Sequence, residues 1–520
     1  MEQKLVKYPI GIQNFESLRM DGYAYVDKTA LVYKLASTGR YYFLSRPRRF
    51  GKSLLLSTLE AYFEGKKEAF KGLAIEQLET EWQQYPILHL DLNAEDYSSE
   101  TALSSILNWH LSSWEEKYGK GDAEETVSRR FAGIIKRAYE KTGKRVVVLV
   151  DEYDKPMVMN LENDELQSKF RNTLKAFYGV LKSSDRYVRF AFLTGVSKFS
   201  KVSVFSDLNN LRDITMVNDY ATICGITEQE LHDNFDDGVE QLANHLNISK
   251  EDCYTRLRLM YDGYHFCLNT PGIYNPFSVI NALSSQAFGE YWFSTGTPTQ
   301  LVMLMKNCNY PLNNLIEGEV STQTLGSIEI MRENPLPYIF QTGYLTLKGY
   351  DPEFDLYNLG FPNQEVENSF IKFLLPLYSN NDANMLQYNI SNFVREIRKG
   401  QPDAFMKRLS AMMADTDYRI VGDSELYFQN FCFVFFRLLG IYVEVERATS
   451  DGRMDMIIKT KDYIYILEFK LDQSADIALQ QIEEKGYANP FATDSRKLFK
   501  IGINFNLEKR SVDEWKLSTN

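Results

Sequence analysis

The sequence of 520 residues lacks the features of several protein classes. Its five cysteines contain no CxxC pair, which argues against a zinc site and against the disulfide framework of a secreted domain. No run reaches the roughly 18 apolar residues of a membrane helix. The start, MEQKLVKYPIGIQNF, has no apolar core of a signal peptide. The five histidines show no ligand spacing, and no GxSxG motif occurs. We therefore expect a cytoplasmic, multi-domain protein with no membrane contact.

An excess of basic residues is also missing. The net charge of −12 argues against a surface that binds nucleic acid everywhere, although a local basic groove remains compatible with it. Two short stretches are candidates for such a groove, VREIRKG (394–400) and SRKLFK (495–500). Each is equally typical of a solvated helix or strand end, so that both interpretations stay open.

One glycine is missing from a phosphate-binding pattern. A Walker A loop reads G-x-x-x-x-G-K-[ST], and Gly51, Lys52 and Ser53 supply its end, but its first position is Arg46. Such a loop turns backbone N–H groups toward phosphates, while its lysine contacts the β and γ phosphates and its hydroxyl binds Mg²⁺. The expected nucleotide-binding residues are Arg46, Pro47, Arg48, Arg49, Phe50, Gly51, Lys52, Ser53 and Leu54.

Short apolar runs alternate with amphipathic stretches between residues 41 and 230. The runs at 40–45, 86–93, 145–154 and 189–195 have strand length and are almost continuously apolar. This alternation predicts an α/β fold, in which a P-loop parallel sheet carries helices on both faces. The stretch 23–39 predicts a helix before the first strand, which is either an adenine-contacting element or a packing helix.

Polar residues follow two of these strands. Asp151 and Glu152 end the run VVVLVDE, which is a Walker B pattern: Asp151 would hold Mg²⁺ together with Ser53, and Glu152 would orient the attacking water. Thr194 ends the next strand and matches a γ-phosphate sensor. The alternative is a solvated strand end and a turn cap. Arg212 is a weaker candidate for a second sensor.

The rest of the chain changes character twice. Residues 236–381 form a mainly helical coupling region, in which 336–347 suggests helix, glycine turn and strand, as in a winged-helix-like module. Residues 382–520 predict a helix, three strands, a second helix over 475–491 and a strand. We therefore divide the chain into domains at 1–235, 236–381 and 382–520.

The last domain contains a candidate metal site. Asp455 lies thirteen residues before Glu468, and a hairpin would bring the two carboxylates together; Lys470 shares a strand face with Glu468. Two carboxylates can hold Mg²⁺ or Mn²⁺, and the lysine can help deprotonate a water molecule. Glu425 could add a metal ligand from the preceding helix, and Gln481 a catalytic contact from the following one. The alternative is a solvated β-face.

These motifs carry two family resemblances. YVDKT, FLSRPRRFGKSLLLSTLEAYFEG, DEYDKP and LTGVSKFS resemble the bacterial AAA-ATPase-like family over roughly residues 8–235, and there RPRRFGKS is the usual loop, so the resemblance makes Arg46 expected. GRMD (452–455), EFK (468–470) and Gln481 to Tyr487 resemble the PD-(D/E)XK nuclease superfamily over roughly 385–510, which implies a restriction-endonuclease-like α/β domain.

The main functional hypothesis is an ATP- and Mg²⁺-binding ATPase with a metal-dependent nuclease domain that acts on DNA. It could form a homo-oligomer through the ATPase domain. A second hypothesis is a STAND-like switch, in which the nuclease-like domain binds nucleic acid or protein without cutting. A third is an ATPase whose partner is a protein.

Overall fold

The computed structural model describes most of the chain in two compact units. The described residues are 6–198, 208, 210–295, 301, 304–305, 310–326, 334–374, 376, 383–414, 424–450, 453–509 and 511–519. The first unit comprises Met1–Leu304 and Glu317–Val366, and the second comprises Met305–Ile316 and Glu367–Asn520. The three-domain division made from the sequence stays a prediction.

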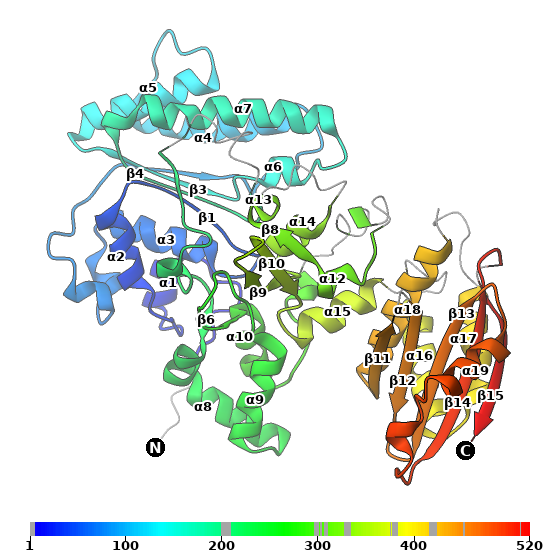
Figure 1. The fold of residues 1–520 in the computed structure, drawn as a ribbon. Coiled ribbons are helices and arrows are strands. Elements are labelled where there is room, and N and C mark those ends of the chain that lie inside the picture. Colours follow the sequence, from blue (N-terminus) through cyan, green and yellow to red (C-terminus); the bar gives the residue numbers. More distant parts are fainter. Residues whose placement is uncertain are drawn as a thin grey trace. The chain divides into compact units, whose positions relative to one another are not determined.

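A parallel sheet forms the centre of the first unit (Figure 1). Its strand order is β2-β3-β4-β1-β5, and every pairing is parallel. The bounds are β1 Tyr41–Ser45, β2 Ile87–Asp91, β3 Val146–Asp151, β4 Val188–Gly195 and β5 Arg212–Asp213. Because helices cover both faces, β1 and β3 are buried along their whole length, which explains their continuous apolar runs.

Figure 1 shows α4, α5 and α7 on one face of this sheet, and α1, α2 and α3 on the other. In α5, the buried residues Phe131, Ile134, Ile135 and Ala138 recur at helical spacing. Phe131 stacks on Phe177 of α7, with ring centroids 4.3 Å apart. The helix bounds are α1 Phe15–Met20, α2 Thr29–Thr38, α3 Lys52–Phe63, α4 Ala102–Tyr118, α5 Val127–Thr142, α6 Lys155–Val158 and α7 Asp164–Ser183. The predicted α/β fold class is confirmed.

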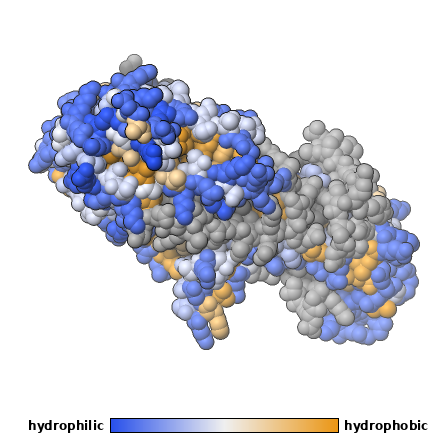
Figure 2. Space-filling model, turned by 90° about the horizontal axis from the view of Figure 1, so that it is seen from above, coloured by the Kyte–Doolittle hydropathy of each residue, from blue (hydrophilic) through white to orange (hydrophobic). Residues whose placement is uncertain are grey.

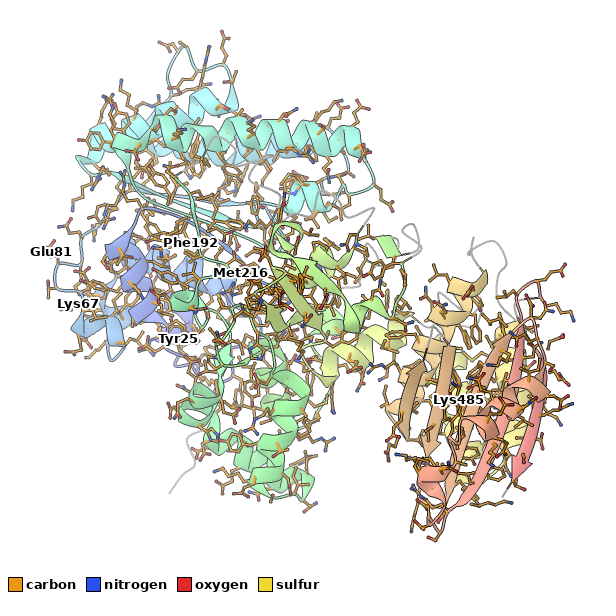
Figure 3. The ribbon with its side chains drawn as sticks, in the orientation of Figure 1. Tyr25, Lys67, Glu81, Phe192, Met216 and Lys485 are labelled. Atoms are coloured by element: carbon orange, nitrogen blue, oxygen red, sulfur yellow. The ribbon has the colours of Figure 1, made fainter. Side chains whose placement is uncertain are left out.

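The outer surface of these helices is polar. Seen from above, the layer of α4, α5 and α7 presents mainly hydrophilic residues (Figure 2). Phe192 of β4 is fully buried, whereas Lys67, Glu81 and Lys485 are exposed (Figure 3). Among the residues that the structure describes, no helix has the length and apolar character needed to cross a membrane.

The rest of the first unit is largely helical, as predicted. α8 begins at a capping box, in which Thr227 and Glu230 bond each other's backbone N–H, and it packs on α9 and α10. α14 is followed by a turn at Gly343 (φ 91°) and by β9, which matches the predicted helix, glycine turn and strand. The bounds are β6 Ile226–Thr227, α8 Glu228–Leu246, α9 Lys250–Tyr261, β7 Ile273–Tyr274, α10 Pro276–Ser285, β8 Glu319–Ser321, α13 Thr322–Leu325, α14 Leu336–Gln341, β9 Thr346–Asp351 and β10 Leu356–Gly360. The helices α12 Asn314–Glu317 and α15 Gln364–Leu374 each contain residues of both units.

The second unit is a mixed sheet with the order β11-β12-β13-β14-β15, in which only β13 and β14 run parallel. The predicted order of helix, three strands, helix and strand is confirmed, but the sequence analysis missed β15, which pairs antiparallel with β14. The bounds are α16 Ala383–Arg398, α17 Pro402–Ala414, α18 Ser424–Gly440, β11 Glu444–Ser450, β12 Arg453–Lys459, β13 Tyr463–Leu471, α19 Ala475–Glu484, β14 Lys497–Asn506 and β15 Ser511–Thr519.

Two predicted helices are shorter than expected. The helix expected over 23–39 begins only at Thr29, because Asp27 accepts hydrogen bonds from the backbone N–H and the hydroxyl of Thr29 at 2.8 and 2.6 Å. The helix expected over 475–491 ends at Glu484, two residues before Gly486 adopts a left-handed conformation (φ 64°).

Candidate nucleotide and nuclease sites

The loop between β1 and α3 has the strand–loop–helix setting that the sequence predicts. β1 ends at Ser45, and α3 begins at Lys52. Two loop residues have positive φ, Arg49 at 66° and Gly51 at 91°. A glycine is favoured at position 51, because residues with a side chain rarely adopt this backbone conformation.

Three of the predicted site residues meet at the carboxyl edge of the sheet. The Ser53 hydroxyl donates to Asp151 Oδ2 at 2.6 Å, and the Thr194 hydroxyl donates to Asp151 Oδ1 at 2.7 Å. Asp151 ends β3, Thr194 lies near the end of β4, and the two strands are parallel neighbours. Parallel strands end at the same edge, so residues far apart in sequence converge there.

Lys52 points toward the same place. Its Nζ donates to the carbonyl oxygens of Arg46 and Pro47 at 3.0 and 3.2 Å, and lies 3.5 Å from Glu152 Oε1. Glu152 itself has a positive φ of 53°. A non-glycine residue in this conformation is uncommon, and such strain is frequent at functional sites.

The Arg46 side chain turns into the protein interior, away from the loop's phosphate-facing side. Only 1% of it is exposed, and its guanidinium donates to the carbonyl oxygens of Ser45, Thr215 and Tyr220 at 2.8 to 3.2 Å. It also lies 4.1 Å from the centroid of the Phe266 ring. Burial lowers the pKa of Arg46. The arginine at the first glycine position therefore ties the loop to residues that follow β5.

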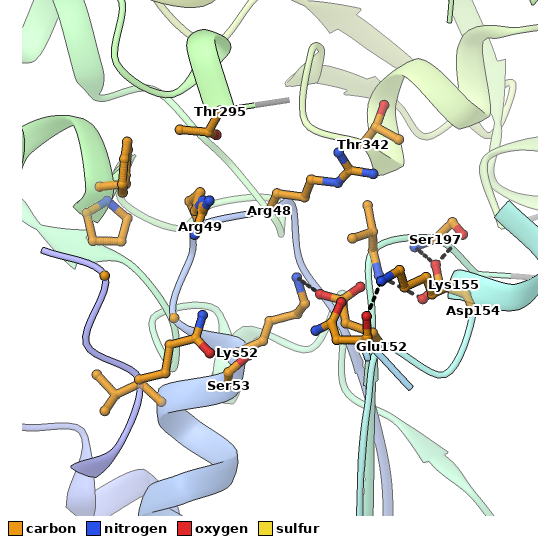
Figure 4. Close-up of a pocket in the computed structure, with 18 of the residues that line it drawn as sticks. Arg48, Arg49, Lys52, Ser53, Glu152, Asp154, Lys155, Ser197, Thr295 and Thr342 are labelled. Atoms are coloured by element: carbon orange, nitrogen blue, oxygen red, sulfur yellow. Dashed lines mark hydrogen bonds and ion pairs between the residues drawn. The ribbon is translucent and has the colours of Figure 1, made fainter. Parts of the chain in front are cut away.

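A cavity of about 530 Å³ opens above Lys52 and Ser53 (Figure 4). Its volume is in the usual range for a small-molecule site. Four cationic residues line it: Arg48, Arg49, Lys52 and Lys155. Its apolar lining includes Pro9, Ile12, Leu54, Pro276, Phe277 and Ile280. The arrangement suits a ligand with an anionic end and an apolar end.

Other predicted residues lie beside the cavity rather than on its wall. Phe50 is buried, with its ring centroid 4.8 Å from that of Tyr264. Arg212, the weaker sensor candidate, is exposed on β5 with its guanidinium 5.9 Å from the Tyr220 ring. A smaller apolar cavity of about 100 Å³ shares Pro9, Leu54 and Ile280 with the main one. Its lining includes Ala24–Val26 of the stretch considered for adenine contact.

Asp154 was missed by the sequence reasoning. It is 1% exposed, lines the cavity, and accepts hydrogen bonds from the backbone N–H groups of Val196 and Ser197 at 3.2 and 2.6 Å (Figure 4). Burial, and after it the charge of Glu152, raises the pKa of Asp154 to about 6. The second aspartate of DEYD was the available signal, but a carboxylate beyond a Walker B pair has no assigned place in that pattern.

In the second unit, three predicted residues meet on β13 and α19. Lys470 Nζ donates to Glu468 Oε1 at 2.8 Å and also to Gln481 Oε1. Glu468 is 0% exposed and Lys470 is 4% exposed. The register of β12 and β13 places Asp455 directly opposite Glu468. The Asp455 side chain lies outside the described part of the structure.

Gly502 explains why α19 can reach this strand pair. It is the β14 residue paired with Glu468, and a Cβ atom there would lie 2.3 Å from the Ala475 carbonyl oxygen and 2.7 Å from the Leu479 backbone N. Only a residue without a side chain allows so close an approach, which holds Gln481 of α19 near Lys470.

The remaining nuclease and groove candidates are less clearly placed. Glu425 is exposed and accepts a hydrogen bond from Gln429 at 3.3 Å. Among the described side chains, no group of three or more His, Cys, Asp or Glu residues could hold a metal ion. Within the 495–500 strip, Arg496 pairs with Asp494, and Lys500 pairs with Glu483. In the 394–400 strip, Arg398 donates to the carbonyl oxygen of Tyr442 at 2.7 Å.

Comparisons with known proteins agree with these two regions. Residues 9–205 match the AAA-ATPase-like family, described as a predicted AAA-ATPase, and residues 423–515 match the PD-(D/E)XK nuclease superfamily. The chain therefore belongs to the AAA-ATPase-like family and carries a C-terminal domain of the PD-(D/E)XK nuclease superfamily. It is 35% identical over 524 residues to a protein of Azotobacter chroococcum, described as an uncharacterized protein in the vnfD 5' region. The match covers 97% of this chain and 98% of that protein.

Proposed function

We propose that the first unit binds and hydrolyses ATP with Mg²⁺. One observation supports this proposal: Asp151 accepts hydrogen bonds from the hydroxyl groups of Ser53 and Thr194, and Ser53 lines a cavity with four cationic residues. Ser53 and Asp151 offer the oxygen ligands that Mg²⁺ prefers. The cationic lining would neutralise the phosphates.

Each residue then has a proposed task. Lys52 and the loop N–H groups bind and orient the phosphates, and Ser53 with Asp151 would hold Mg²⁺, which supplies charge neutralisation when bound. Glu152, beside Lys52, orients the attacking water and accepts its proton. The Thr194 hydroxyl donates a hydrogen bond to Asp151 and so orients this carboxylate. If Thr194 also contacts the γ phosphate, that contact would change the position of Asp151.

For the second unit we propose metal-dependent hydrolysis of DNA phosphodiesters. Asp455 and Glu468, opposite one another in the β12–β13 ladder, would hold Mg²⁺ or Mn²⁺, with Glu425 as a further candidate ligand. The Lys470 ammonium, fixed by its hydrogen bond to Gln481, would position the attacking water and stabilise the hydroxide that forms as the water gives its proton to bulk solvent.

One observation favours the alternative of a switch that binds without cutting. Glu468 has no exposed surface, and Lys470 already donates to both Glu468 and Gln481. An ammonium has three N–H donors, so one remains for a water molecule, but a metal ion would first have to reach a Glu468 carboxylate that has no exposed surface. In that alternative, a STAND-like exchange of nucleotide would change the assembly, and the nuclease-like unit would bind nucleic acid or protein.

The deciding experiment is a nuclease assay on single- and double-stranded DNA and RNA with Mg²⁺, in the presence and absence of ATP. The full chain is compared with Lys470→Met, which keeps the volume of the side chain, and with Lys509→Ala as a surface control. Cleavage by the full chain that Lys470→Met abolishes supports the nuclease. Binding without cleavage supports the alternative, and ATP-dependent change in molecular mass tests its assembly step.

We also propose that the protein works in the cytoplasm and self-associates through its ATPase unit. Its charge of −12 and the lack of a CxxC pair among its five cysteines support the first part. Light scattering with and without ATP tests the second, since an unchanged monomer would contradict it.

A further inference from the structure

The loop that lines the cavity is fixed from outside by a residue far away in sequence. The indole Nε1 of Trp292 donates to the carbonyl oxygen of Arg48 at 2.9 Å. Trp292 is 5% exposed, and its ring centroid lies 5.3 Å from that of Tyr344. Because Arg48 lines the cavity, this bond fixes the backbone of a residue that would contact phosphate.

The same tryptophan is held in turn by a buried carboxylate. Its backbone N–H donates to Glu365 Oε1 at 2.6 Å, and Glu365 is 0% exposed. Glu365 lies in the first turn of α15. Among the described residues, none forms an ion pair with this carboxylate. Burial, and after it the charge of a neighbouring acid, Glu290, instead raises the pKa of Glu365. A buried carboxylate of this kind is retained at an energetic cost, which points to a role beyond packing.

Helix α15 begins at Gln364 and leaves the first unit within its first turn. The division between the two compact units falls between Val366 and Glu367, inside α15. A displacement of the P-loop at Arg48 would therefore act, through Trp292 and Glu365, on the first turn of a helix whose remaining turns belong to the other unit.

We propose that Trp292 and Glu365 are a positioning pair, which fixes the P-loop wall at Arg48 and makes the nucleotide site and helix α15 change state as one. This inference rests on the proposed ATP binding. Neither residue touches the ligand in this role; they act through the backbone of Arg48.

The test compares Trp292→Phe with Trp109→Phe in the full chain. Phenylalanine keeps an aromatic ring and removes only the N–H donor, and Trp109 is a matched control because it is 65% exposed on α4. Two quantities are measured: the Kd of ATP, and the hydrogen exchange of residues 364–374 with and without saturating ATP. We expect ATP to slow exchange of this segment in the unaltered protein.

Trp292→Phe should weaken ATP binding about five- to tenfold, since a buried carbonyl loses its partner, and should abolish the ATP-dependent slowing even at saturation. Trp109→Phe should behave like the unaltered protein. Replacement of Trp292 by benzothienylalanine, which has the same shape but no N–H, gives the same loss if Trp292→Phe folds poorly.

The inference is overturned if Trp292→Phe and the benzothienyl protein keep both the affinity and the slowing, or if ATP leaves exchange of 364–374 unchanged in the unaltered protein. Failure of the proposed function gives a different result, because the unaltered protein would then not bind ATP at all. A merely structural role would lower the thermal midpoint of Trp292→Phe while leaving the ATP-dependent slowing in place.

Discussion

The two candidate sites treat buried charge in opposite ways. In the nucleotide site, the Asp151 carboxylate accepts hydrogen bonds from neutral hydroxyl groups. Lys52 Nζ donates to backbone carbonyl oxygens, lies 3.5 Å from Glu152 Oε1, and lines an open cavity. In the nuclease-like site, Lys470 Nζ donates hydrogen bonds to the side chains of Glu468 and Gln481. Both ammonium groups donate two hydrogen bonds, but Lys52 lines the cavity and can offer its third N–H to an anionic ligand, whereas Lys470 is bonded directly to the carboxylate of its own site.

Two fully buried glutamates sharpen the same contrast. Glu365 and Glu468 are both 0% exposed, but only Glu468 has a lysine partner. Burial raises the pKa of Glu365 to about 7. The first unit therefore keeps its buried acid by favouring protonation, and the second by forming an ion pair.

The largest expected effect comes from breaking that ion pair. Lys470→Ala removes the lysine partner of the buried Glu468 carboxylate, which should destabilise the second unit by about 3–5 kcal/mol. Urea unfolding followed by hydrogen exchange of β13 and β14 measures it. The exposed pair Lys509–Asp513 provides the control, since Lys509→Ala should cost about 1 kcal/mol or less. Adding Glu468→Gln should recover most of the loss; equal effects of the two lysines would contradict the contrast.

A second prediction concerns the available cation of the first site. Lys52→Ala should weaken ATP binding about 100-fold, as expected for loss of charge-assisted hydrogen bonds to phosphate. Calorimetric titration measures it, with the exposed Lys182→Ala on α7 as control. Arg46→Gly should weaken binding far less, because the Arg46 guanidinium contacts only carbonyl oxygens and a ring. Equal losses would identify Arg46 as a phosphate ligand.

Next in size is the packing that closes the second site. Gly502→Ala places a methyl group against the Ala475 carbonyl oxygen, so α19 must move and take Gln481 with it. We expect a loss of about 1–3 kcal/mol in unfolding free energy. Gly440→Ala in α18 is the control, because its nearest neighbour would be 4.0 Å away, at Val445. A neutral Gly502→Ala would mean that α19 adjusts freely.

The smallest predicted effect is a pH dependence. The pKa of Glu365 is raised to about 7 in the folded protein, so the folded state binds more protons than the unfolded state between its ordinary pKa of 4.5 and 7. Stability from this group is therefore present at low pH and is lost as pH rises to 7. Glu365→Gln removes this loss. Relative to the unaltered protein, its free energy of unfolding should therefore rise by about 2 kcal/mol from pH 5 to pH 8. A constant difference across this range would show that Glu365 does not titrate there.

The site residues that could be predicted from the sequence are those whose position depends on where a strand ends or on which face of a strand they lie. Asp151 and Thr194 were found because both follow apolar runs, and parallel runs must end at one edge. Glu468 and Lys470 were found because alternate residues share a face. Side-chain direction was out of reach: the letter at position 46 does not say that the guanidinium turns inward. Trp292 was also beyond prediction, because its contact with Arg48 spans 244 positions and follows no period.

The short segment Met305–Ile316 has a consequence for handling the protein. It belongs to the second unit, where Asn430 bonds the Leu312 N–H at 2.8 Å and the Tyr310 carbonyl at 3.0 Å, yet the chain returns to the first unit at Glu317. The backbone thus passes from one unit to the other three times. A cut at any one crossing therefore does not separate the two units cleanly, because at least one of the two fragments still contains parts of both. A nuclease-like fragment that begins at Glu367 would lack the segment that Asn430 binds.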